Sequence, residues 1–437
     1  MYGNTSKDTA KELLLFSIPM ILSAVFQQMF NWADALIVGN FAGEEALAAI
    51  GATTSCYNII LDLILGASAG ITILAARYYG AGEHSRIRQL FATFVRFLPA
   101  GALLVVAAGI ACTPSLLQLL HTPEEILVDS VLYLRWMYAG LLFLAVYNTL
   151  AAILRGMSDS RAPFRSVVAA GAANIALDFL FVAGLHMGVG GAALATFLTQ
   201  GVMTGYLLVY AARHAPFLTE GVLQEKADLH MFREGMYYAL PLMLQGAAAS
   251  VGKVILTGFR NGFGISVIAA ITTAYRVDTV LISPVHNLGA AVAAKVSQKL
   301  GAGEQTKAKE VLRAGLWMGI GFAAVMTGFV ILAGGTLIGI FGVSAQVRRI
   351  GASFFRYLGQ FYIMCAVMEV LHGCLQGYGD VRFAAGNMLY QLAVRIVLSY
   401  ALRPVFGWKV IAYAEGLSWC AAALSAWLRS RRKTMVS

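Results

Sequence analysis

Four polar side chains stand inside long apolar runs, where they could form a binding site for a proton or a small cation. Asn174 and Asp178 are four residues apart and therefore share one face of a helix. Asp34 lies in the first apolar run, and Thr196 lies near the start of the sixth. These carboxylate, amide and hydroxyl groups could load and release a proton or hold a sodium ion. Two plainer interpretations stay open: Asp34 could face water at a helix end, and Asn174 and Asp178 could be a structural hydrogen-bonded pair.

The composition explains why such residues are informative. The chain has 437 residues, of which 59% are hydrophobic and 12% are charged. Soluble domains carry about 25% charged residues, so the composition indicates an integral membrane protein whose partner is the lipid bilayer. The net charge of +10 is then explained by basic cytoplasmic loops, and we expect no nucleic-acid partner.

The elements that must position the polar residues are membrane-spanning helices, and we predict an all-α fold. Each apolar run has the length of a span, about 20 residues. The first run begins near Leu13 and is longer than the apolar region of a signal peptide, so we expect a spanning helix there. The twelve predicted spans are 13–37, 47–76, 92–112, 131–153, 164–184, 189–211, 235–258, 266–294, 314–340, 354–376, 384–402 and 409–428.

An internal repeat divides the chain into halves. LRGMSD begins at Leu154 and LQGYGD begins at Leu375, 221 residues later, and the two GAGE segments at Gly80 and Gly301 have the same offset. Six spans return the chain to the same side of the membrane, so the repeats are parallel and related by an axis along the membrane normal, as in one transporter architecture. We predict an N-lobe at 1–211, a cytoplasmic linker at 212–234, and a C-lobe with a basic cytoplasmic tail at 235–437.

Basic residues set the predicted orientation. Lysine and arginine favour one side of the predicted spans by about four to one, which places both termini in the cytoplasm of a multi-pass plasma (inner) membrane protein. On that side the GAGE turns supply glycines that stop the preceding helices. Gly66 and Gly70 have the spacing that lets two spanning helices approach closely.

The C-terminal half carries a different set of polar residues. At the repeat offset, Arg395 takes the place of Asn174 and Ser399 that of Asp178. Glu369, Arg395 and Lys253 make a possible C-lobe polar site, and we hypothesise that Arg395 or Lys253 neutralises Glu369 because an unpaired charge in lipid is costly. The asymmetry predicts that ion coupling resides in the N-terminal half.

The motifs together resemble the multidrug and toxic compound extrusion (MATE) family of secondary transporters over nearly the whole chain. The resemblance lies in Pro19, the Asp34–Gly39 stretch, GAGE at 80–83, LRGMSDSRAP at 154–163, the Asn174–Asp178 segment and LQGYGD at 375–380.

The resemblance implies a twelve-helix, V-shaped, two-lobe fold with a central cavity. It also implies multidrug efflux of cationic or amphipathic compounds by antiport with protons or sodium ions. The family's N-lobe cation site maps onto Asp34, Asn174, Asp178 and Thr196, and Pro19 would act as a hinge in the first span. The family position for a C-lobe acid in span 10 falls at Cys365, so the resemblance does not extend to a C-lobe sodium site.

The alternative function is a flippase for a lipid-linked precursor, which would need a cavity rich in arginine and lysine. The sequence contains no metal-ligand spacing and no nucleophile motif, so we expect no enzyme, no resident metal and no cofactor beyond the coupling ion. We expect the transporter to act as a monomer.

Overall fold

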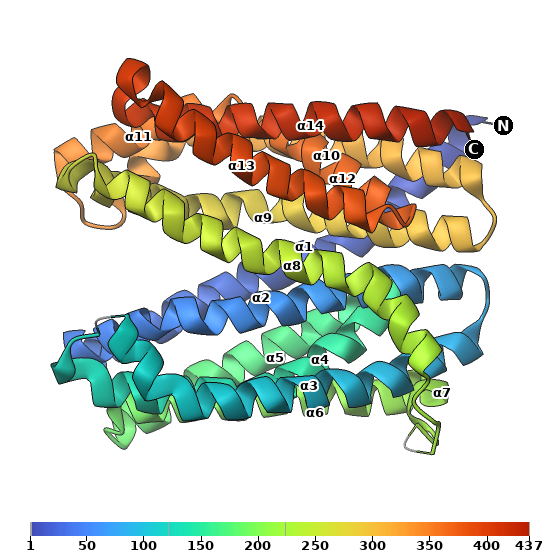
Figure 1. Cartoon of the computed structure of the whole chain (residues 1–437), viewed down its shortest axis with the longest axis horizontal. Helices are drawn as coiled ribbons and strands as arrows, with labels where there is room; N and C mark the ends of the chain where they lie inside the picture. Colours follow the sequence, from blue (N-terminus) through green and yellow to red (C-terminus); the bar gives the residue numbers. More distant parts are fainter. Residues whose placement is uncertain (1, 121, 223, 437) are drawn as a thin grey trace. The chain divides into compact units, whose positions relative to one another are not determined.

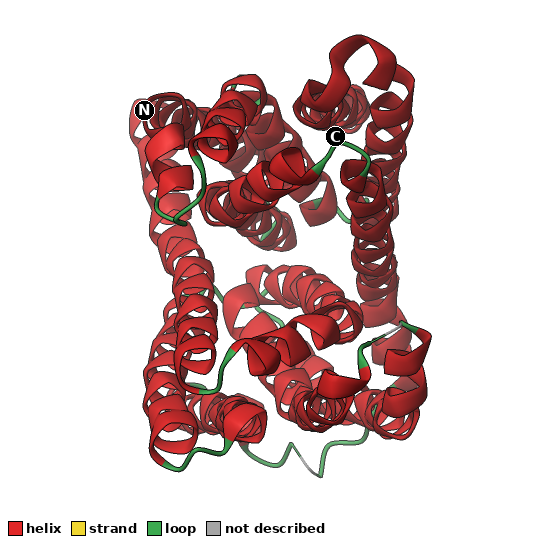
Figure 2. Cartoon of the chain, turned by 90° about the vertical axis from the view of Figure 1, so that its left-hand side faces the viewer, coloured by secondary structure: helices red, strands yellow, loops and turns green. Residues whose placement is uncertain are grey.

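The computed structural model describes residues 2–120, 122–222 and 224–436, with side chains from residue 8 to residue 432 apart from residues 121 and 223. Within these residues every regular element is a helix, and short loops join the helices (Figures 1 and 2). The all-α prediction is confirmed. The helices run beyond the apolar runs that predicted them, so most are longer than a bilayer core requires.

The first half of the chain contains six long helices. The fifth continues from its α-helical part into one π-helical stretch, η1, directly after Asp178. The elements are α1 (Tyr2–Phe41), α2 (Glu44–Gly80), α3 (His84–Leu119), α4 (Glu124–Gly156), α5 (Arg161–Asp178), η1 (Phe179–Gly184) and α6 (Gly188–His214).

The second half repeats the order of the long helices, but the counterpart of α4 is broken into two helices. The elements are the short α7 (Pro216–Thr219), α8 (Leu229–Asn261), α9 (Ile265–Gly301), α10 (Gln305–Gly339), α11 (Ala345–Gly359), α12 (Tyr362–Gly377), α13 (Val381–Phe406), η2 (Gly407–Lys409) and α14 (Val410–Val436). Counting α11 and α12 as one broken span gives the twelve predicted spans.

A hydrogen bond from α10 lies beside the break in the tenth span. The axes of α11 and α12 are bent by 51°. The Gly359 carbonyl, at the end of α11, accepts a hydrogen bond of 2.7 Å from the Thr327 hydroxyl of α10. This contact lies at the break, although the Thr204 hydroxyl of α6 donates to the Phe143 carbonyl of α4 without breaking that helix. At the repeat offset α4 has Tyr138 instead of Gly359, and α4 is continuous.

Length and hydropathy support a multi-pass membrane protein. In the described part of the chain, nine helices are long and apolar enough to cross a membrane, and the bent α11–α12 pair makes ten. α13 and α14 are not among the helices that meet this criterion of length and hydropathy. In α13 the apolar face is interrupted by Arg395 and by two further arginines.

Contacts between Cα atoms divide the chain into two compact units. Unit 1 contains residues 1–21 and 247–437, and unit 2 contains residues 22–246. The division falls inside α1 and inside α8, close to Pro19 and Pro241. The predicted lobe boundaries at 211 and 235 follow the sequence repeat, whereas the contact units are divided at different residues. Each unit therefore includes the start of a helix that ends in the other unit.

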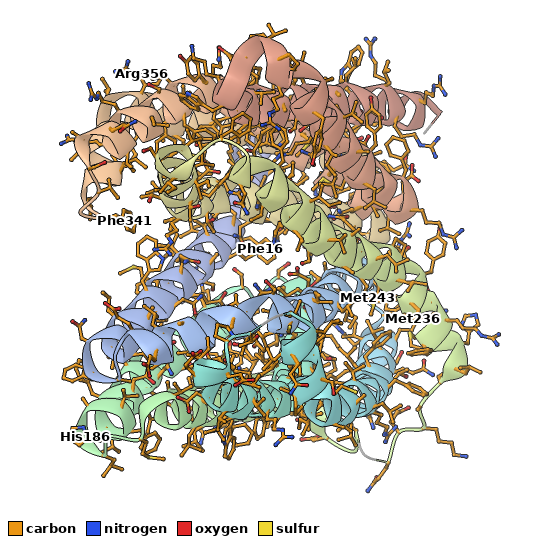
Figure 3. The ribbon with its side chains drawn as sticks, turned by 60° about the vertical axis from the view of Figure 1, so that its left-hand side comes forward. Phe16, His186, Met236, Met243, Phe341 and Arg356 are labelled. Atoms are coloured by element: carbon orange, nitrogen blue, oxygen red, sulfur yellow. The ribbon has the colours of Figure 1, made fainter. Side chains whose placement is uncertain are left out.

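Ion pairs and an aromatic contact hold the start of α1 in unit 1. The Glu12 carboxylate lies 2.7 Å from the Lys295 ammonium and 3.2 Å from that of Lys299, both on α9. Lys295 also lies 4.9 Å from the ring centroid of Phe16, which Figure 3 labels on α1. Because Lys295 is only 4% exposed, the Glu12 carboxylate neutralises a buried charge.

The start of α8 packs against α2 in unit 2 through the predicted pair of glycines. A Cβ atom at Gly66 would lie 2.6 Å from the backbone of Met243, and one at Gly70 would lie 2.5 Å from the backbone of Ala239. Met243 is labelled on α8 in Figure 3. The predicted close helix approach is confirmed, with α8 as the partner.

The GAGE turns also have the predicted form. Gly82 and Gly303 adopt φ angles of 74° and 75° directly after α2 and α9. In this region a side chain is strained, and glycine is the usual residue that ends a helix there.

Candidate functional site

The polar residues of the first half come together in unit 2, at the contact between α1 and α5. The register of the two helices is set one turn away, where the Phe30 ring packs directly over Gly171; a Cβ atom at Gly171 would lie 1.9 Å from this ring. One turn further along α1 is Asp34, and one to two turns further along α5 are Asn174 and Asp178. The missing side chain at Gly171 therefore lets α1 approach α5 beside the acidic residues.

Asp34 and Asp178 face each other at this contact. Their carboxyl groups lie within hydrogen-bonding and Coulombic reach of one another. Asp178 is fully buried, and Asp34 is partly buried. Two unit charges about 4 Å apart repel by roughly 4 kcal/mol in a protein environment with an effective dielectric constant near 20. A shared proton or a bound cation would remove this repulsion.

The buried polar atoms of the pair have no hydrogen-bond donor among the described residues. This holds for Asp34 Oδ1 and for both carboxylate oxygens of Asp178, and the nearby Asn174 Nδ2 likewise lacks an acceptor. Buried polar groups are normally satisfied, so each such atom calls for an explanation. A site that takes up a proton or cation during its working cycle supplies one.

Apolar and aromatic side chains enclose the acidic pair. Tyr133 on α4 lies close enough to interact with the charge of both carboxyl groups. It belongs to a buried cluster with Ile37 of α1 and Val182 of η1, against which Tyr57 of α2 packs. Such an enclosure limits access of water and strengthens any electrostatic interaction inside it. The π-helical stretch that starts at Phe179 adds a local distortion of a kind often found at functional sites.

The structure does not bring Thr196 into hydrogen-bonding contact with the acidic pair. Thr196 lies on α6 and is partly buried, and no hydrogen bond joins its hydroxyl to either aspartate in the described residues. Its place in the cation site stays a prediction.

The three predicted C-lobe residues line one cavity of about 630 Å³ in unit 1. Lys253 comes from α8, Glu369 from α12 and Arg395 from α13. Their predicted pairing is wrong. Arg395 Nη2 lies 2.8 Å from Glu415 Oε2 of α14, while the nearest basic group to Glu369 is His286, at 3.8 Å. Because α14 packs against α13, the Arg395 guanidinium pairs with Glu415 and not with Glu369.

Tyr275 of α9 completes a buried network with this ion pair. Its hydroxyl donates to Glu415 Oε2 at 2.7 Å and accepts from Arg395 Nη2 at 2.8 Å. In the same cavity the Tyr362 hydroxyl donates to Asp278, which is 5% exposed. Sequence reasoning missed Glu415 and Tyr275. The signal for Glu415 was present, because it is an ionisable residue inside the last predicted span.

Comparison with known sequences gives a consistent assignment. A family model described as MatE matches residues 19–180 and 241–401, so one family pattern fits both halves of the repeat. A probable multidrug resistance protein of Bacillus subtilis, YpnP, is 27% identical over 98% of this chain and 96% of its own length. The multidrug export protein MepA of Staphylococcus aureus is 21% identical over 97% of this chain and 95% of its own length.

Comparison with solved structures shows the fold. A MATE transporter from Vibrio cholerae superposes with a TM-score of 0.93 at 19% identity, covering 99% of each chain. An outward-facing multidrug resistance MATE transporter of the MOP superfamily gives a TM-score of 0.92 at 20% identity, covering 98% of this chain and 96% of that one. A MOP superfamily transporter from Pyrococcus furiosus gives 0.91 at 20% identity, covering 97% and 96%.

Proposed function

Because the chain belongs to the MatE family, we propose that it exports cationic or amphipathic small molecules in exchange for protons, by alternating access. The observation that carries the proposal is the facing pair Asp34 and Asp178, whose buried oxygen atoms lack donors within the described residues. The names of the relatives, multidrug resistance and multidrug export proteins, support efflux of small molecules. We propose the cell membrane as its location, with both termini in the cytoplasm.

The acidic pair supplies the coupling. In the outward-facing state Asp34 and Asp178 take up protons, which removes the repulsion between them and lets α1 shift against α5. Pro19 favours bending of α1, because proline has no amide hydrogen to give to the helix ladder. Coupling requires that protons and cargo stabilise different states of the transporter. Cargo then leaves outward, and the protons are released inward after the transporter has turned.

The size of the driving force is set by the gradient. Each proton that moves down a gradient of one pH unit provides about 1.4 kcal/mol, which corresponds to a tenfold concentration ratio of cargo. Two protons, one for each aspartate, would support up to about a hundredfold ratio.

The test is efflux of a fluorescent cationic dye from proteoliposomes under an imposed proton gradient. Wild type should move the dye uphill, and Asp34→Asn should bind the dye but lose uphill movement. Asp129→Asn is the matched control, because this aspartate of α4 is exposed and lies outside the acidic pair. Normal uphill export by Asp34→Asn would refute the coupling role.

Two alternatives predict different outcomes. Dye movement driven only by a sodium gradient would indicate that sodium, and not the proton, is the coupling ion, bound at Asp34, Asn174, Asp178 and Thr196. No dye movement under either gradient would favour a flippase for a lipid-linked precursor, and movement of such a lipid would be measured next.

A further inference from the structure

The cavity of unit 1 is a second enclosed polar site that the acidic pair does not use. It lies among α8, α9, α12, α13 and α14, and its volume of about 630 Å³ is within the range of small-molecule pockets. Lys253, Arg260 and Arg395 provide its basic groups, while Asp278, Glu369 and Glu415 provide its carboxylates, and His286 also lines it. What this cavity can bind depends on which of these charges are already neutralised.

Two of the carboxylates have hydrogen-bond donors within the protein. Glu415, 6% exposed, accepts from both Arg395 and Tyr275. Asp278 accepts from Tyr362. The Glu415 carboxylate, 2.8 Å from Arg395 Nη2, neutralises that arginine.

The basic groups of α8 have no such partner. Within the described residues no carboxylate lies within 4.0 Å of Lys253 or of Arg260. The third acid, Glu369, faces His286 from the side of α12 and α9. The α8 wall of the cavity therefore carries an excess of positive charge, in a part of the protein where uncompensated charge is costly.

Arg260 is held in a fixed position with donors to spare. Its Nη2 donates to the Thr257 hydroxyl at 2.6 Å, its Nε donates to the Leu256 carbonyl at 3.3 Å, and its guanidinium lies 5.0 Å from the ring centroid of Tyr275. A guanidinium has five N–H donors, so these contacts leave most of them for a ligand. Lys253 is seven residues earlier on α8, on the same face, and its side chain is exposed to the cavity.

The rest of the lining is apolar. Met368, Ile411 and Trp419 contribute to walls that suit the hydrocarbon or aromatic body of a ligand. We propose that this cavity binds amphipathic organic anions, with the carboxylate or sulfonate on Arg260 and Lys253 and the apolar body against these walls. The inference rests on the proposed function in that the bound anion would be exported cargo, and it adds anions to the cationic compounds named above.

The test is equilibrium binding of three probes with one aromatic body: pyrenebutyrate, the neutral pyrenebutanol and a pyrenebutyl trimethylammonium cation. The transporter is held in nanodiscs of zwitterionic lipid, and binding to empty nanodiscs is subtracted. Wild type should bind the anion more tightly than the alcohol. Arg260→Gln should weaken anion binding by roughly tenfold or more, the loss expected for a hydrogen bond to a charged group, and should leave binding of the cation unchanged or stronger.

Three further variants separate recognition from folding and from general surface charge. Lys253→Gln removes a side chain that makes no hydrogen bond or ion pair with the described residues, so it should weaken anion binding without unfolding the protein. Arg260→Lys should restore part of the affinity because it keeps the charge. Arg349→Gln is the matched control, since this arginine of α11 is exposed and does not line the cavity, and it should bind as wild type does.

Equal binding of anion and alcohol by wild type would overturn the proposal, as would an equal loss in Arg349→Gln. Binding of an anionic lipid added to the nanodisc, with no binding of pyrenebutyrate, would also overturn it in favour of a lipid site. Binding needs no gradient and should survive in Asp34→Asn. A failure of proton coupling therefore leaves this result intact, and a failure of anion binding leaves the coupling result intact.

Discussion

The contact between α2 and α8 predicts a steric penalty for one added methyl group. In Gly70→Ala the new Cβ would lie 2.5 Å from the Cα and N atoms of Ala239. Carbon atoms normally pack at about 3.5–4.0 Å, so the two helices would have to separate by about 1 Å. The contact is with backbone, so no change of side-chain rotamer can relieve it. Gly66, one turn away, faces the same helix and prevents a simple tilt.

The steric cost of Gly70→Ala can be isolated by comparison with a second glycine of the same helix. Gly51 also lies in α2, but a Cβ atom there would meet no described atom within 4 Å. Replacing glycine by alanine inside a helix gains about 0.8–1.0 kcal/mol from propensity, and this gain is shared by both variants. The difference between Gly51→Ala and Gly70→Ala therefore isolates the steric cost, which for an overpacked site is about 1–3 kcal/mol.

The assay is reversible denaturation of the two purified variants and wild type in mixed micelles, followed by tryptophan fluorescence. Gly51→Ala should unfold at or above the denaturant concentration of wild type, and Gly70→Ala should unfold below it. If Gly70→Ala is as stable as Gly51→Ala, α2 and α8 do not touch through their backbones at this position, and the packing described for unit 2 is wrong.

Three further predictions concern unit 1. Arg395→Gln leaves Glu415 buried without its cation and should lower the free energy of unfolding by about 3–5 kcal/mol; a double variant that also carries Glu415→Gln should recover part of this loss in the same denaturation assay. Glu12→Gln leaves Lys295 without its closest carboxylate and should increase hydrogen–deuterium exchange at the start of α1, while exchange in α6 stays unchanged. Thr327→Val removes the hydroxyl at the α11–α12 bend and should cost about 1 kcal/mol of stability, the net value of one hydrogen bond; no measurable change would show that the bend does not depend on this contact.

The features that sequence predicted well depend on short-range patterns. Long apolar runs predicted the helices, and the spacing of Gly66 and Gly70 predicted a close approach because four residues make about one helical turn. The same period predicted that Asn174 and Asp178 share a face. That Asp34 meets Asp178 required only that two ionisable residues in apolar helices face the protein interior.

Other features depend on the rotation and tilt of one helix against another, which no short pattern encodes. Arg395 or Lys253 was expected to neutralise Glu369, yet Arg395 pairs with Glu415, because α14 presents its carboxylate to α13. The bend between α11 and α12 lies beside a hydrogen bond from a hydroxyl of α10 that is 32 residues away from its acceptor. The sequence repeat does not predict the bend either, because α4, which corresponds to α11 and α12, is a continuous helix.

Because α1 is divided between the two units, its two parts can pack only at different times during synthesis. Glu12 and its partner Lys295 are separated by 283 residues. At about 5–20 residues per second, the ribosome needs roughly 15–60 s to deliver Lys295 after Glu12 has been made. Throughout that interval Glu12 lacks Lys295, whereas residues 22–41 of the same helix can pack against α5 before the interval ends, as soon as α5 has been made. The first helix of the chain is therefore among the last to be completely packed, and a nascent chain arrested before α9 would present an N-terminal segment accessible to protease.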